Sequence, residues 1–101
     1  MSMTNQSPSD NRSLQRYPLV VDAQIRTGST RTMVRIVDIS VSGVRLQAAR
    51  SLREGEAFWL KLPLIEAREI RVAWVNQFVV GCEFLQPLHP SVLENIVNSA
   101  R

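Results

Sequence analysis

Two arginines near the start of the chain, Arg12 and Arg16, are separated by three residues. Each guanidinium is a planar fork of N–H donors. Such a fork can grip a phosphate with two bonds, lie flat on an aromatic base, or read the O6 and N7 acceptors of a guanine. Two forks this close in sequence suit a purine nucleotide. For Arg12 taken by itself, the alternative is a side chain that only contacts solvent.

A second group of polar side chains interrupts an apolar pattern in the run Asp38-Ile-Ser40-Val-Ser-Gly43. A carboxylate only accepts hydrogen bonds, so Asp38 could receive the N1–H and N2–H donors of a guanine. Ser40 and the backbone at Gly43 add small donors suited to a phosphate. An ordinary hairpin turn closed by Asp and Ser side chains also explains the run when it is taken alone.

Together the two motifs resemble those of the PilZ domains of bacteria. There Arg-x-x-x-Arg near the start precedes Asp/Asn-x-Ser-x-x-Gly by about one strand pair, and both motifs are complete here. The resemblance covers residues 12–84 and includes three further segments: Tyr17-Pro18, Val72-Ala-Trp74 and Gly81-Cys-Glu-Phe84. It implies a six-stranded antiparallel β-barrel that acts as a receptor for cyclic di-GMP, the ring of two guanylates that bacteria use as a second messenger.

The resemblance also implies a set of ligand-binding residues. They are Arg12, Arg16, Asp38, Ser40 and Gly43. Trp74 is a further candidate, because relatives can carry an aromatic residue beside the ligand near this position. Arg35 is another, because its strand leads to the Asp38 turn, although an arginine that points into solvent is the favoured interpretation. Many relatives have a second Arg next to the first motif Arg, whereas Asn11 and Ser13 flank Arg12, so the number of ligand molecules is left open.

The hydrophobic pattern predicts an all-β chain with a C-terminal helix. Apolar and polar residues alternate as in half-buried strands. The predicted strands are Leu19–Arg26, Thr32–Ile39, Val44–Ala48, Glu56–Leu62, Glu66–Val75 and Phe78–Phe84. Ile70, Val72 and Trp74 are expected on one face of the fifth strand. Six strands at this spacing favour a small barrel or sandwich, of which the resemblance selects the barrel.

The chain end predicts a helix over about residues 91–99. Ser91 and Glu94 have the spacing of a capping box, while Leu93, Ile96 and Val97 recur at helical spacing. We expect this helix to pack against the barrel and close one open end. His89, just before it, is expected in a loop.

Length and composition predict one domain in a cytoplasmic protein. The chain has 101 residues, 45% of them hydrophobic, and a net charge of +3. Residues 1–11 are polar and predict a flexible tail, so the domain is assigned to 12–101. No run of apolar residues is long enough for a signal peptide or a membrane span.

The sequence offers little for catalysis or metal binding, so we expect no enzyme, cofactor or metal. Cys82 has no basic neighbour and His89 has no ligating partner at metal-site spacing. We expect cyclic di-GMP and an unidentified effector protein as partners, and no nucleic acid. Two alternatives stay open: a barrel that binds single-stranded nucleic acid, disfavoured by 6% aromatic content, and a nucleotide-independent adaptor of the pilus-assembly kind.

Overall fold

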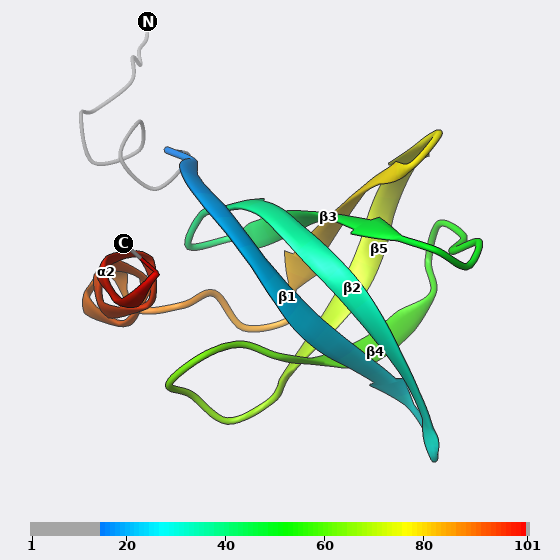
Figure 1. Cartoon of the computed structure of the whole chain (residues 1–101), viewed down its shortest axis with the longest axis horizontal. Coiled ribbons are helices and arrows are strands. Elements are labelled where there is room, and N and C mark those ends of the chain that lie inside the picture. Colours follow the sequence, from blue (N-terminus) through cyan, green and yellow to red (C-terminus); the bar gives the residue numbers. More distant parts are fainter. Residues whose placement is uncertain (1–14, 101) are drawn as a thin grey trace, which may run out of the picture.

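The computed structural model describes residues 15–100, which form six β-strands and one helix (Figure 1). The strands are β1 (Tyr17–Thr27), β2 (Thr30–Ile39), β3 (Gly43–Ala48), β4 (Ala57–Lys61), β5 (Arg68–Asn76) and β6 (Val79–Phe84), and the helix is α2 (Pro90–Ser99). The six predicted strands are confirmed. Within this part of the chain, no helix is long and apolar enough to cross a membrane.

The strands close into an antiparallel barrel in the order β1-β2-β3-β6-β5-β4, with β4 returning to β1. The predicted fold class is therefore confirmed. β1 and β2 form a long hairpin of nine residue pairs, from Tyr17↔Ile39 to Thr27↔Thr30. The β1–β4 seam has only three pairs, from Gln24↔Lys61 to Arg26↔Trp59.

Apolar side chains from all six strands and from α2 fill the barrel. The most enclosed include Ile36, Leu46, Leu60 and Ile70, each at most 1% exposed. Because successive side chains of a strand point to opposite faces, every second residue enters this core and the others line the outer surface. On this outer surface Arg16 of the first motif contacts Asp38 of the second.

The helix α2 lies against the barrel beside β1 (Figure 1), with Leu93, Ile96 and Val97 buried as predicted. The predicted capping box is wrong. His89 is the N-cap, and its Nδ1 accepts a hydrogen bond from the backbone N–H of Ser91 at 3.0 Å. Pro90 suits the first helical position because its φ is preset and it has no N–H to satisfy, so the helix begins one residue before Ser91.

Irregularities in three strands determine which side chains reach the site. The register shifts between Pro18 and Val21 in β1, between Ile36 and Asp38 in β2, and between Val72 and Trp74 in β5. The third shift corrects a prediction, because Trp74 does not share the buried face of Ile70 and Val72. Its side chain lies on the outside of the barrel and is 39% exposed.

Candidate functional site

One carboxylate, Asp38, holds two guanidiniums. Arg16 Nε donates to Asp38 Oδ1 at 2.6 Å. Arg45 Nε donates to the same oxygen at 3.0 Å and lies 2.8 Å from Oδ2. Arg16 immediately precedes β1, and Arg45 faces Asp38 across the β2–β3 pair. The ends of three neighbouring strand segments therefore supply this cluster.

Burial makes the cluster more than a surface ion pair. The side chain of Asp38 is 17% exposed, compared with 30% for Arg16 and 40% for Arg45. Partly buried charges need partners, and hydrogen bonds to charged groups are stronger than neutral ones. Asp38 therefore fixes the position of both guanidiniums, while their remaining N–H donors can serve a ligand.

Ser40 organises the turn that follows Asp38. Its side chain is fully buried. Its Oγ accepts from the backbone N–H groups of Ser42 and Gly43, both at 3.2 Å, and from Arg16 Nη1 at 3.4 Å. The backbone N–H of Ser40 donates to the Gly43 carbonyl at 2.8 Å. These bonds give Ser40 a positioning role, and its direct contact with a ligand stays a prediction.

Two glycines permit close approaches beneath the site. A Cβ on Gly43 would lie 2.0 Å from the carbonyl oxygen of Cys82, so only glycine fits where β3 meets β6. A Cβ on Gly81 would lie 2.2 Å from the Trp74 ring, so the indole rests directly on the backbone there. Gly81 also pairs with Arg45 on its other side. Arg45, Gly81 and Trp74 thus form a row across β3, β6 and β5.

An open groove of about 260 Å³ lies on the outside of the barrel beside this cluster; Arg16 and Arg45 line it, whereas Asp38 and Ser40, which hold Arg16, do not. Its lining residues are Arg16, Ser42, Gly43, Val44, Arg45, Ala73, Trp74, Gly81, Cys82 and Glu83. Guanidiniums at one side and an indole at the other can hold an anion and a flat ring together. The groove therefore has the chemistry of a nucleotide site.

The structure brings most predicted site residues together. Asp38 and Ser40 contact Arg16, and Gly43 and Trp74 line the same groove. Arg12 lies outside the described residues.

Arg35 is placed elsewhere. Its Nη2 lies 3.0 Å from Asp22 Oδ1, and both side chains are exposed. It is not among the residues that line the groove.

Sequence reasoning missed Arg45. It also missed that the Trp74 indole packs directly on the backbone of Gly81. Arg45 stands two residues after Gly43, at an outward position of β3, which was the available signal. The second signal was the pairing of a glycine with a tryptophan on neighbouring predicted strands. Neither signal identifies a ligand site without the register that brings these residues opposite each other.

Cys82 is a free, buried cysteine. Burial raises the pKa of the Cys82 thiol to about 12, so the thiol stays protonated at neutral pH and is a poor nucleophile. Among residues 15–100, no group of three or more His, Cys, Asp or Glu side chains is arranged to hold a metal ion.

Comparison with known families identifies the family to which this chain belongs. The sequence profile of the PilZ domain matches residues 10–100, nearly the whole chain. The chain belongs to the PilZ domain family. PilZ domains are binding and adaptor domains and are generally receptors for cyclic di-GMP. No curated protein matches this chain.

Proposed function

We propose that this PilZ domain binds cyclic di-GMP in the groove beside Asp38. The observation that carries the proposal is the pairing of one half-buried carboxylate with two guanidiniums, opposite an indole that lies on the outer face of the barrel. The ligand combines two phosphates with two flat guanines. A groove with both forks and an aromatic ring offers complementary groups for each part.

Arg16 and Arg45 are the phosphate and guanine donors in this proposal. Each guanidinium carries five N–H donors, of which the Nε–H is engaged by Asp38. The outer nitrogens of the fork can bond a phosphate or the O6 and N7 edge of a guanine. The flat face of Trp74 can stack on a base.

Asp38 can keep its predicted role as a guanine acceptor while it holds both arginines. A carboxylate offers about four acceptor positions. Its three short contacts to Nε atoms leave capacity at Oδ2, which has one such contact. Arg12, which completes the first motif, is proposed as an additional phosphate donor.

Binding would change no covalent bond, so the signal would pass through contacts with an effector protein. A ligand held by Arg16 joins the segment before β1 to the outer surface of β3, β5 and β6. That joint surface differs between free and bound protein and is available for recognition.

A calorimetric titration with cyclic di-GMP tests the proposal, with cyclic di-AMP as the matched control. We expect saturable binding of the guanine ring and weak binding of the adenine ring. Adenine has a donor at N6 where the arginines need the O6 acceptor, and it lacks the N1–H and N2–H donors for Asp38. Absence of heat with cyclic di-GMP, or equal affinity for both rings, contradicts the proposal.

A competition experiment with a single-stranded oligonucleotide, at about 50 and 200 mM salt, tests the nucleic-acid alternative. Affinity for a polyanion falls steeply over this range because condensed counterions are released on binding. A cyclic dinucleotide has no such counterion layer, so its affinity should respond only to ordinary screening. An oligonucleotide that displaces cyclic di-GMP at low salt and fails to do so at high salt favours the alternative.

A further inference from the structure

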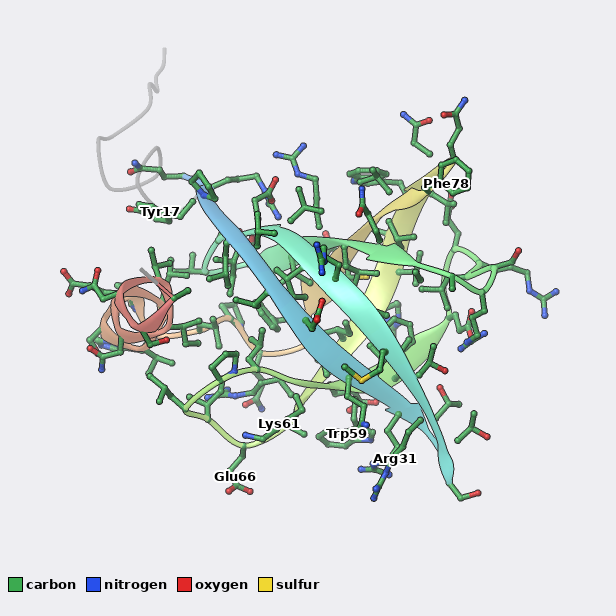
Figure 2. The ribbon with its side chains drawn as sticks, viewed as in Figure 1. Tyr17, Arg31, Trp59, Lys61, Glu66 and Phe78 are labelled. Carbon is green, nitrogen blue, oxygen red and sulfur yellow. The ribbon has the colours of Figure 1, made fainter. Side chains whose placement is uncertain are left out.

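A second group of basic and apolar side chains lies at the other end of the β1–β2 hairpin. Arg26 of β1 stands opposite Arg31 of β2 on one side and opposite Trp59 of β4 on the other. Met33 follows on β2, opposite Gln24 of β1. Figure 2 shows Trp59 and Arg31 close to one another along one edge of the molecule. We call Arg26, Arg31, Met33 and Trp59 the hairpin patch.

The two arginines of the hairpin patch lack a counter-charge in the described structure. Within residues 15–100, neither Arg26 nor Arg31 forms an ion pair; Arg26 Nη1 donates to the Gly28 carbonyl at 3.2 Å. Like charges directly opposite each other on paired strands destabilise a sheet. The same hairpin pairs Asp22 with Arg35 nearer its middle. Two facing arginines therefore do not serve the stability of the hairpin.

The apolar members of the hairpin patch are exposed to solvent. Met33 is 58% exposed and Trp59 is 40% exposed. Tryptophan, arginine and methionine are among the residues enriched where proteins contact one another, and Trp and Arg are frequent among those that carry most of the binding energy. Two adjacent cations beside these side chains favour a partner that brings negative charge.

We propose that the hairpin patch is a docking surface for an acidic segment of a partner protein. Carboxylates of the segment would bond the forks of Arg26 and Arg31, and one apolar side chain would cover Trp59 and Met33. Glu69 of β5 stands opposite Trp59 on the remaining side, so the segment approaches over β1 and β2. This surface is separate from the cyclic di-GMP groove: Arg16 precedes β1, Arg26 lies near the far end of that strand, and no member of the hairpin patch lines the groove.

Other partners fit the hairpin patch less well. Single-stranded nucleic acid needs a basic groove with several aromatic platforms, and the hairpin patch has one aromatic ring. Anionic membranes are recognised by clusters of roughly four to eight basic residues. The hairpin patch has only two arginines, which is fewer than such a cluster needs. A protein segment needs only two carboxylates and one apolar contact, which matches the residues present.

Selection of a random peptide library displayed on phage, using the full chain as bait, tests the docking surface. We expect enriched peptides that combine two or more Asp or Glu residues with an aliphatic or aromatic residue. The affinity of the best peptide should fall roughly tenfold or more in Arg26→Glu, in Arg31→Glu and in Trp59→Ala. A peptide with Lys in place of one Glu should regain affinity for Arg31→Glu.

Two control variants keep this result separate from folding and from cyclic di-GMP. Arg53→Glu makes the same charge change at an exposed loop residue and should leave peptide affinity unchanged. Arg16→Ala alters the nucleotide groove and should also leave it unchanged. Melting temperatures of all variants check the fold.

Several outcomes overturn the docking surface. They are no enriched peptide, peptides without acidic bias, equal loss in Arg53→Glu, and displacement of the peptide by oligothymidylate or by phosphatidylglycerol vesicles. The last two competitors would assign the hairpin patch to nucleic acid or to lipid. None of these outcomes depends on whether cyclic di-GMP binds, so the two proposals fail separately.

Discussion

The two ends of the β1–β2 hairpin differ in whether their arginine side chains are paired with a carboxylate. Near its start, Arg16 and Arg45 share Asp38, and all three side chains are partly buried. At its far end, Arg26 faces Arg31 without a counter-charge in the described structure. Burial explains the difference, because a desolvated charge needs a partner whereas an exposed one is solvated by water. An exposed like-charged pair is therefore tolerated, although it does not add to the stability of the hairpin.

The largest effect on ligand affinity should follow from removing the guanidinium of Arg16, which is paired with Asp38. Arg16→Ala should weaken cyclic di-GMP binding by roughly 2–3 kcal/mol, about 30- to 150-fold, because charge-assisted hydrogen bonds are lost. Titration calorimetry measures this. Arg31→Ala is the matched control at the other end of the hairpin and should bind the ligand as wild type does. Equal affinity in Arg16→Ala and wild type would show that Arg16 does not contact the ligand.

Removing the shared carboxylate charge should cost stability. Asp38→Asn keeps the side-chain shape but leaves two half-buried guanidiniums without their counter-charge, so the free energy of unfolding should fall by about 1–3 kcal/mol. Denaturant titration measures it. Asp22→Asn, at the exposed pair with Arg35, is the control and should change it by less than about 1 kcal/mol. Similar losses in the two variants would mean that burial does not distinguish them.

Displacing the Trp74 indole should weaken ligand binding in the groove without unfolding the barrel. In Gly81→Ala the new Cβ occupies the space of the ring, so the Trp74 indole must move away from the backbone at residue 81. If the indole stacks on a guanine, affinity should fall by about 1–2 kcal/mol, roughly 5- to 30-fold. Fluorescence in a Trp59→Phe background reports Trp74 alone. An altered Trp74 spectrum with unchanged affinity would exclude stacking.

The smallest expected effect is a gain in stability rather than a loss. Arg31→Glu converts the like-charged pair with Arg26 into an attractive one and should raise the free energy of unfolding by about 0.2–1 kcal/mol. Thermal and denaturant unfolding at low salt measure it, and the gain should shrink as salt is added. A loss of stability would remove the premise that this pair is strained by repulsion.

The sequence was enough to predict the barrel, the helix and the choice of Arg16 and Asp38 as candidate residues of one site. Alternation shows which residues face the core, and the motifs show which turn is polar. The shift in β2 brings Asp38 opposite Arg45, and the shift in β5 places Trp74 on the outer face of the barrel. A pattern of period two cannot predict such shifts, because each one exchanges the two faces of the strand that contains it. The His89 cap was missed because Pro90 moves the start of α2.

The β1–β4 seam joins its strands through three residue pairs, whereas β1 and β2 share nine. With so few backbone hydrogen bonds to break, this seam should open in local fluctuations before any other part of the barrel wall, so its amides should exchange with deuterium first. Arg26 and Trp59 form the last of those three pairs. A partner segment bound to both Arg26 and Trp59 would hold β1 and β4 together. Its binding should therefore slow deuterium uptake along β4.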